Sequence, residues 1–202
     1  MRYSQHVCLS RSVLAHGPRQ AHVWLIFNVG QKTMSEVRVI FPEENWVLVD
    51  FRQKDMPGVA MVNRGLKKLE PKKVFQRHFS IMIQLSDIAE NGMPSQAERD
   101  VVDPFGDKLD ERIKGEERKP NALFLARITW NSTRELIWRV YDPEPVDAFL
   151  KEMIAAKSQP REFDYRIDPD PEWKLAEWHL TAGKEGAQPG GTDNDRAAPG
   201  RV

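Results

Sequence analysis

The 202-residue sequence contains a single cysteine, Cys8, and no long hydrophobic run. One thiol cannot form an intrachain disulfide, so a reducing, cytoplasmic setting is expected. The most apolar stretch near the N-terminus, residues 23–27, is far shorter than the ~18 residues that a membrane-spanning helix needs. No small-residue cleavage site follows it, as a secretory signal would require. We therefore expect no membrane partner.

The first part of the chain also lacks acidic residues. Residues 1–33 contain no Asp or Glu, whereas the whole chain carries 30 acidic and 30 basic side chains and has no net charge. The change in composition at Met34 predicts that residues 1–33 are an unstructured leader or a mis-assigned upstream extension. Residues 182–202 are rich in glycine and poor in apolar side chains, which predicts a disordered tail. A single α+β domain is expected at residues 43–180.

The motifs of the common catalytic sites are also missing. The sequence has no phosphate-binding loop, no H-E-x-x-H, no C-x-x-C and no G-x-S-x-G. His78 and His179, the histidines of the folded part, have no nucleophile near them in the sequence, and we interpret them as surface or strand-end residues. No catalytic residue and no cofactor are predicted.

Clustered carboxylates are the one pattern that suggests a metal site. The stretch "REFDYRIDPDPEWKLAEWHL", residues 161–180, carries Asp164, Asp168, Asp170 and Glu172. Carboxylate oxygens are ligands for hard cations, but a calcium loop needs a glycine at its sharp turn. Pro169 and Pro171 occupy that region instead. We interpret the run as a charged strand end followed by a turn, and we predict no metal site.

Strand patterns recur along the folded part. Apolar runs at 46–51 and 58–62 predict a hairpin. Alternation of apolar with polar residues predicts further strands at 78–85, 122–130, 134–142 and 162–168. One face of the strand at 122–130 is predicted to hold Ala122, Phe124, Ala126, Ile128 and Trp130. The loop "NST" follows that strand, with Asn131 in a left-handed conformation.

Two helices are predicted between these strands. Ser95 and Glu98 form the S-x-x-E pattern of a capping box within residues 91–113. Pro104 predicts a break or kink near residue 103, because an interior proline removes a hydrogen bond and costs ~3 kcal/mol. Asp142 caps a second helix at 143–157. The apolar stripe of that helix is Val146, Phe149, Leu150, Met153 and Ile154.

The predicted order from residue 78 onward is strand, helix, strand, strand, helix, strand. This is the order of a ferredoxin-like βαββαβ fold with an antiparallel sheet. The hairpin at 46–62 is then an additional N-terminal β-hairpin. The predicted fold class is therefore α+β.

Several short motifs resemble one known bacterial family. They are "NGMP" followed by a glutamate, "ARITWNSTRELIWRVYD" and a terminal "D-P-E-W". Over residues 43–178 the chain resembles the domain-of-unknown-function family 695, which is loosely similar to the regulator of ribonuclease E activity B. The resemblance implies a ferredoxin-like fold and no defined activity. The residues that carry it are Asn91, Gly92, Pro94, Glu98, Arg127, Thr129, Arg134, Tyr141, Asp170 and Trp173. Pro104 and the turn at 131–133 depart from the family pattern.

Two groups of side chains are candidates for binding a partner. The segment at residues 63–78 is a candidate surface for phosphates or an acidic protein. Its basic residues are Arg64, Lys67, Lys68, Lys72, Lys73 and Arg77. A solvated connector is the plainer interpretation of this basic segment. The second group is predicted to share the sheet face that no helix covers: Arg127, Arg139 and Tyr141.

These observations favour a small cytoplasmic bacterial protein that acts as a non-catalytic interaction or regulatory module with a protein partner. Two alternatives stay open: a weak RNA-associated module that uses the basic segment, and an enzyme whose site follows no recognisable motif. Nucleic acid is the less favoured partner, because the net charge is zero and Phe75 is the only aromatic residue within the basic segment.

Overall fold

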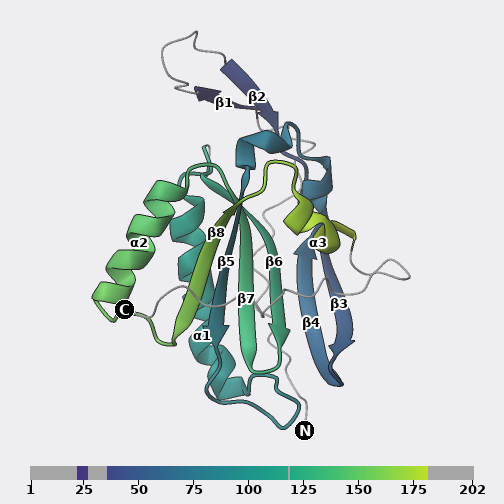
Figure 1. Ribbon diagram of the computed structural model, residues 1–202, viewed down its shortest axis with the longest axis vertical. Helices are drawn as coiled ribbons and strands as arrows, with labels where there is room; N and C mark the ends of the chain where they lie inside the picture. Colours follow the sequence, from purple (N-terminus) through teal and green to yellow (C-terminus); the bar gives the residue numbers. More distant parts are fainter. Residues whose placement is uncertain (1–21, 27–35, 118, 182–202) are drawn as a thin grey trace, which may run out of the picture.

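The computed structural model describes residues 22–26, 36–117 and 119–181 (Figure 1). Within them, six strands form one antiparallel sheet in the spatial order β3-β4-β6-β7-β5-β8. The strands are β3 (Trp46–Gln53), β4 (Met56–Asn63), β5 (Arg77–Gln84), β6 (Ala122–Trp130), β7 (Thr133–Val140) and β8 (Phe163–Pro169). The α+β class predicted from the sequence is confirmed.

A separate two-stranded sheet precedes the main one. β1 (His22–Ile26) pairs antiparallel with β2 (Glu36–Ile40). The backbone N–H of Ile40 donates to the carbonyl of Glu70 at 3.0 Å, which ties β2 to the main domain. β1 falls within the segment 1–33 that the sequence predicts as a leader. The rest of that segment and the predicted tail at 182–202 lie outside the described residues.

Helices cover both faces of the main sheet. α1 (Gln96–Lys114) and α2 (Pro143–Ala155) lie on one face, and four short helices pack on the other (Figure 1). The short helices are η1 (Arg64–Lys68), η2 (Lys72–Phe75), η3 (Lys174–Ala176) and α3 (Glu177–Thr181). Each face of the sheet therefore has its own hydrophobic core.

The core beneath α1 and α2 is built from alternate residues of β5 and β7. Phe79 and Trp138 stack in it with ring centroids 5.3 Å apart. The strand residues of this core include Phe79, Ile81, Ile83, Leu136, Trp138 and Val140. Phe163, Tyr165 and Ile167 of β8 pack against the same core, as their alternation in the sequence predicts.

The core on the other face depends on segments outside the strands. The basic segment between β4 and β5 contributes Leu66, Leu69, Val74 and Phe75. The chain after β8 contributes Trp173, Ala176 and Leu180. The basic segment is therefore a structural part of the domain, and its exposed lysines project from short helices that are anchored by apolar side chains.

A β-bulge in β6 changes which residues face the long helices. The register against β7 shifts between Phe124 and Ala126, and Leu125 and Ala126 both lie in the core beneath the short helices. Beyond the bulge, Arg127 faces α1 and Ile128 faces the opposite side. The single apolar face predicted along this strand is wrong, because one extra residue reverses the alternation.

α1 runs through Pro104 as one helix, so of the predicted break or kink near residue 103 the break is wrong. Pro104 is exposed, and the other side of the helix carries a continuous buried stripe: Val102, Phe105, Leu109 and Ile113. Burying each such side chain stabilises by ~1.5–3 kcal/mol. Together these contacts outweigh the ~3 kcal/mol cost of an interior proline. The predicted cap is confirmed, because the Ser95 hydroxyl accepts from the N–H of Glu98 at 3.1 Å.

Two tight turns connect neighbouring strands of the sheet. Lys54 and Asp55 join β3 to β4 with φ of 49° and 63°, and Asn131 and Ser132 join β6 to β7 with φ of 45° and 62°. Two-residue loops with positive φ at both positions match the right-handed twist of the flanking strands. The left-handed Asn131 is confirmed, although the loop has two residues because Thr133 already belongs to β7.

The packing of α2 yields a stability test. Leu150 is fully buried and Ile154, one turn later, is 42% exposed. Leu150→Ala should lower the free energy of unfolding by ~2–5 kcal/mol, because it removes buried contacts and leaves a cavity. Ile154→Ala on the same helix should change it by less than ~0.5 kcal/mol. Urea unfolding of both variants measures the difference, and equal losses would contradict the packing described here.

Candidate functional site

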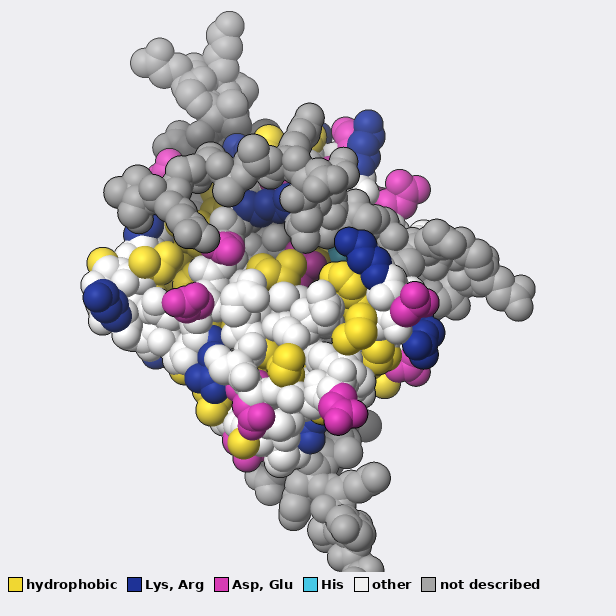
Figure 2. All heavy atoms as spheres, turned by 60° about the horizontal axis from the view of Figure 1, so that its bottom comes forward, with side chains coloured by type: hydrophobic (Ala, Val, Ile, Leu, Met, Phe, Trp, Pro, Cys, Tyr) yellow, Lys and Arg dark blue, Asp and Glu magenta, His cyan; other side chains and the backbone are white. Residues whose placement is uncertain are grey.

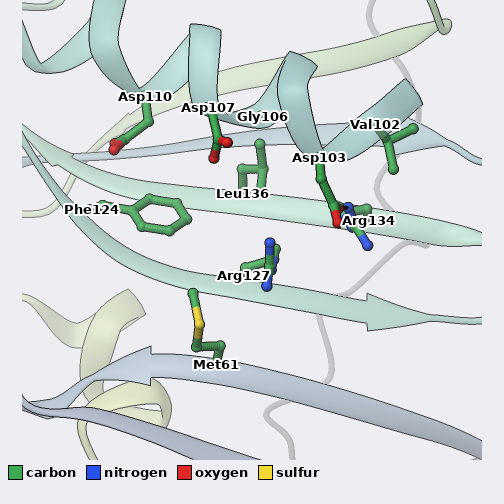
Figure 3. A pocket seen from close by; sticks show the side chains of 10 residues that line it. All are labelled: Met61, Val102, Asp103, Gly106, Asp107, Asp110, Phe124, Arg127, Arg134 and Leu136. Carbon is green, nitrogen blue, oxygen red and sulfur yellow. Dashed lines mark hydrogen bonds and ion pairs between the residues drawn. The ribbon is translucent and has the colours of Figure 1, made fainter. Parts of the chain in front are cut away.

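A small cleft opens between α1 and the middle of the sheet (Figure 3). Its volume is about 80 Å³. Side chains of α1, β4, β6 and β7 line it: Met61, Val102, Asp103, Gly106, Asp107, Asp110, Phe124, Arg127, Arg134 and Leu136. Arg127 reaches this cleft only because the bulge in β6 turns it toward α1.

Arg134 is held firmly at one end of the cleft. Its side chain is buried, forms an ion pair with Asp103 of α1, and donates from Nε to the hydroxyl of Thr129 at 3.4 Å. Burial lowers the pKa of Arg134 from its ordinary value, but a guanidinium stays protonated in proteins. The ion pair therefore joins α1 to β7 and closes this end of the cleft.

Asp110 is engaged at the other end. Its carboxylate accepts from Trp138 Nε1 at 2.8 Å and pairs with Lys114 Nζ at 2.7 Å. Asp107 and Arg127 project into the cleft from opposite sides (Figure 3), and neither forms an ion pair with another described residue. These two side chains are the charges of the cleft that remain available to a ligand.

The chemistry of the cleft is limited by its side chains. The lining residues are carboxylates, guanidiniums and apolar groups, with no histidine, cysteine or serine among those that the structure places there. Carboxylates can act as nucleophiles, but Asp103 and Asp110 are engaged in ion pairs with Arg134 and Lys114. Across the described residues, no three His, Cys, Asp or Glu side chains converge in a way that suits a metal ion. The arrangement suits recognition of a charged group.

A second polar cluster lies on the opposite side of the sheet, around Arg139 of β7. Arg139 is fully buried. Its Nη1 donates to Asp170 Oδ2 at 2.8 Å, and its Nη2 donates to the Asp170 carbonyl at 2.6 Å and the Phe75 carbonyl at 3.2 Å. The guanidinium also lies over the ring of Trp173, 4.5 Å from the centroid. All three guanidinium nitrogens of Arg139 therefore have hydrogen-bond acceptors, and one planar face packs on an aromatic ring.

Asp170 serves two structural roles at once. Besides pairing with Arg139, its carboxylate accepts from the backbone N–H of Lys174 at 2.8 Å and of Leu175 at 3.1 Å. It therefore caps η3 and fixes the chain that leads into α3. Trp173 donates from Nε1 to the Lys72 carbonyl at 3.0 Å, which links the same region to η2. The segment after β8 is held in place by Arg139.

The two histidines lie next to this cluster rather than in the cleft. His78 contacts Arg139 through Nδ1 at 3.2 Å, and the rings of His78 and His179 are 6.1 Å apart between centroids. Burial, followed by the nearby His179 and Arg139, lowers the pKa of His78 to about 3. Burial also lowers the pKa of His179 to about 4. Both rings are neutral at pH 7, and their interpretation as surface residues is wrong.

Glu98 forms a third buried contact, at the start of α1. Arg161, just before β8, donates from Nε and Nη2 to its two carboxylate oxygens at 2.9 and 2.8 Å. The backbone N–H groups of Ser86 and Asp87 donate to the same carboxylate. The hydrogen bonds from Arg161 lower the pKa of Glu98 to about 2. Glu98 therefore links α1 to two other segments. In a capping box its carboxylate would instead accept a hydrogen bond from the backbone N–H of Ser95.

The basic segment is only partly a solvated surface. Its exposed residues are Lys67, Lys68 and Lys73, and its half-buried ones are Arg64, Lys72 and Arg77. The Nε atoms of Arg64 and Arg77 are buried without a hydrogen-bond partner among the described residues. The lysines therefore remain candidates for binding an anionic partner, whereas the arginines lie closer to the core.

The second predicted group is not brought together. Arg127 lines the cleft beneath α1, Arg139 is fully buried on the other face, and Tyr141 packs against the core there. The prediction that they share an open sheet face is wrong for two physical reasons. The bulge turns Arg127 to the opposite side, and η2 together with the segment after β8 covers Arg139.

The acidic run is dispersed by the fold. Asp164 and Glu172 are exposed, and Asp168 Oδ2 lies 3.4 Å from Arg166 Nε. Asp170 is buried with Arg139. The four carboxylates thus have different environments, and the pairing of Asp170 with Arg139 is a contact that the sequence analysis missed. The signal was the "D-P-E-W" motif, which places Asp170 and Trp173 in one turn.

Comparison with protein families agrees with this framework. Residues 44–178 match the model of a family described as "Family of unknown function (DUF695)". The chain belongs to this family. The resemblance seen in the sequence motifs is thereby confirmed, and the DUF695 region contains the whole main sheet. No curated protein and no solved structure matches the chain significantly.

The residues that carry the DUF695 resemblance now have structural positions. Arg127, Thr129 and Arg134 belong to the cleft, whereas Asp170 and Trp173 hold Arg139. Glu98 holds Arg161. None of the helices in the described part of the chain is long and apolar enough to cross a membrane.

The buried ion pair predicts a large and specific loss of stability. Asp170→Asn should lower the free energy of unfolding by ~3–5 kcal/mol, because it leaves the Arg139 charge buried without its counterion. Asp168→Asn, two residues earlier and beside an exposed arginine, should cost less than ~1 kcal/mol. The double variant Arg139→Met/Asp170→Leu should recover part of the loss. Urea unfolding tests all three variants. A cost below ~1 kcal/mol for Asp170→Asn would contradict the buried ion pair of Asp170 with Arg139.

The neutral histidines predict a pH dependence of stability. The pKa values of His78 and His179 are lowered on folding to about 3 and about 4, so the unfolded chain binds more protons below its histidine pKa near 6.5. Their stabilisation is complete above that pKa and is lost as the pH falls. From pH 7 to pH 5 the loss should be about 2 kcal/mol per histidine. Glu98 adds no change in this window, because its stabilisation is lost only below the ordinary glutamate pKa of 4.5.

A single variant distinguishes the contributions of the two histidines to the pH dependence of stability. His179→Phe keeps an aromatic ring but removes one titrating group, so it should remove about half of the loss between pH 7 and pH 5. Chemical unfolding at both pH values gives the result. A wild-type stability that stays constant across this window would show that the rings are not held neutral.

Proposed function

We propose that this DUF695 protein is a small, non-catalytic interaction module that acts in the cytoplasm. The observation that carries the proposal is the location of the two histidines. Both are buried beside Arg139 on the face opposite the cleft, so the two histidines, which are the best proton carriers near neutral pH, are separated from the cleft beneath α1. The buried ionic groups serve packing: Arg139 with Asp170, and Glu98 with Arg161.

The size of the cleft supports the same proposal. Its volume of about 80 Å³ is well below the ~300–1,000 Å³ of sites that enclose a small-molecule substrate. A single side chain of a protein partner fits a space of this size. Asp107 and Arg127 offer charges of both signs to such a side chain.

An apolar surface continues from the cleft across the hairpin of β3 and β4. Trp46 contacts Phe124 with ring centroids 5.7 Å apart, which places it on the same sheet side as α1. Trp46 is 36% exposed and Leu48 is 67% exposed, and Val59 and Met61 of β4 are half-buried. Among the described helices, α1 and α2 pack on the other four strands and do not cover this side of the hairpin. The surface therefore suits a protein partner that places an apolar side next to a charged one.

The arrangement of the elements supports a ferredoxin-like domain with an added hairpin. The chain order β5-α1-β6-β7-α2-β8 combines with the spatial order β6-β7-β5-β8, which fits the split βαβ scheme. β3 and β4 extend the sheet on the β6 side. The similarity to the regulator of ribonuclease E activity B rests on the sequence motifs alone.

RNA is the alternative partner, and the exposed Lys67, Lys68 and Lys73 of the basic segment favour it. Against it, Phe75, the aromatic residue of that segment, is fully buried and cannot stack on a base. On the face shown in Figure 2, Lys and Arg side chains are interspersed with Asp and Glu side chains. This mixed surface favours a protein over a polyanion.

The proposal is tested by capture from native cell extract with full-length wild type, Arg127→Glu and Lys151→Glu. Arg127 faces the cleft, whereas Lys151 is an exposed cation on α2. A protein partner should be captured by wild type and Lys151→Glu and lost with Arg127→Glu. Equal capture by all three would overturn the cleft as the binding surface.

The RNA alternative is tested by a gel shift with mixed single-stranded RNA. Replacing Lys67, Lys68, Lys72 and Lys73 by Glu should leave the fold intact, because the first two and Lys73 are exposed, Lys72 is half-buried, and none belongs to the hydrophobic core. Wild-type binding near ~1 µM at ~150 mM salt, abolished in this variant, would favour the RNA module over a protein partner. We expect no such binding.

A further inference from the structure

The two edges of the main sheet differ in what they present. At one edge, β8 carries exposed Asp164 and Arg166, ends at Pro169 and follows Pro160. Charges and prolines of this kind prevent an edge strand from pairing with another chain. At the other edge, β3 has the sequence WVLVDFRQ, without proline and with Leu48 67% exposed. β3 also carries the exposed charges Asp50 and Arg52, but it contains no proline and exposes Leu48, so its edge is less protected than the β8 edge.

The turn between β3 and β4 defines which backbone groups of β3 are free. Gln53 and Met56 flank the two-residue loop and pair with each other. In such a hairpin this closing pair is hydrogen-bonded, and hydrogen-bonded positions then alternate along the strand. Val47, Val49, Phe51 and Gln53 therefore bond to β4. The N–H and C=O groups of the alternate residues point away from the sheet: Trp46, Leu48, Asp50 and Arg52.

We propose that β3 pairs antiparallel with β3 of a second copy of this chain, about a twofold axis at Leu48. The two six-stranded sheets then form one continuous sheet. This inference goes beyond the proposed function, because it concerns the edge of the sheet and leaves the cleft beneath α1 free, while it shares Trp46 and Leu48 with the apolar surface of the hairpin described above.

The side chains of β3 are self-complementary in this register. Leu48 lies opposite Leu48 of the second copy, and Trp46, whose indole N–H donates to Glu44 of its own chain at 2.9 Å, lies opposite its Asp50. Arg52 lies opposite Glu44 of the second copy. On the other face of the sheet, Val47 lies opposite Val49. Apolar groups thus meet at the axis and opposite charges meet at the ends, and such cross-strand pairs stabilise a sheet.

The neighbouring registers are less favourable. The two residues of a cross-strand pair must have their side chains on the same face of the sheet. The twofold axis can therefore pass through any residue of β3, but not between two residues. An axis at Asp50 places the two Asp50 carboxylates directly opposite each other, which is destabilising. An axis at Val49 places each Leu48 opposite an Asp50. An axis at Val47 places each Glu44 opposite an Asp50, which brings like charges together. The axis at Leu48 is therefore the register that the sequence of β3 favours.

The test is sedimentation velocity of the full chain from ~1 to ~200 µM, which resolves a concentration-dependent dimer. Leu48→Lys places two cations opposite each other at the axis and should weaken the dimer by at least ~10-fold. Leu175→Lys is the matched control, because Leu175 is an apolar residue that is 45% exposed and lies on η3, outside the edge strand. It should leave the dimer unchanged.

Hydrogen exchange distinguishes edge pairing from any other dimer. The outward N–H groups of Leu48 and Asp50 should exchange slowly at high protein concentration and rapidly on dilution or in Leu48→Lys. The N–H groups of Val47 and Val49, which bond to β4, should be protected in every sample. Circular dichroism of Leu48→Lys checks that the fold is retained.

Three results would overturn the proposal. One is a monomer at every concentration, which would leave the β3 edge to a different partner. Another is a dimer that resists Leu48→Lys as it resists Leu175→Lys. The third is a dimer whose Leu48 and Asp50 amides exchange as fast as in the diluted protein.

Discussion

A guanidinium that is shielded from solvent must find all its partners inside the protein, and Arg139 imposes this requirement on the fold. Its donors reach the Phe75 carbonyl on one side and both the side chain and the carbonyl of Asp170 on the other. Phe75 belongs to the segment before β5, and Asp170 belongs to the segment after β8. The core on this face of the sheet therefore forms only when the two distant segments meet at one side chain.

The parts of the fold governed by local chemistry follow from the sequence. The Ser95 and Asp142 caps, the alternation along β8 and the left-handed Asn131 all depend on a few neighbouring residues. The bulge in β6 cannot be predicted in this way. No residue type in the strand marks its position, yet the extra residue reverses the direction of every side chain that follows it. The misplacement of Arg127 follows from this alone. The uninterrupted α1 is a tertiary effect, since its buried stripe overrides Pro104.

The candidate site was harder to predict because its members are far apart in the chain. The partner of Arg139 lies 31 residues later, and the partner of Glu98 lies 63 residues later. Spacing and alternation contain no information on such pairs. Motif resemblance singles out Asp170, Trp173 and Glu98, but it indicates no long-range partner for any of them. The contacts of Asp170 and Trp173 form only because β8 lies antiparallel to β5, which brings the start of β5 next to the end of β8.

The order of the chain gives the Arg139 cluster a further consequence. A ribosome releases the protein from its N-terminus, so β7 emerges before the segment that carries Asp170 and Trp173. Until that segment has left the exit tunnel, Arg139 lacks its counterion and the surface beneath η2 lacks its cover. The domain therefore completes its second core only after the segment following β8 has emerged, and a nascent chain that stalls within β8 exposes apolar surface to chaperones and proteases.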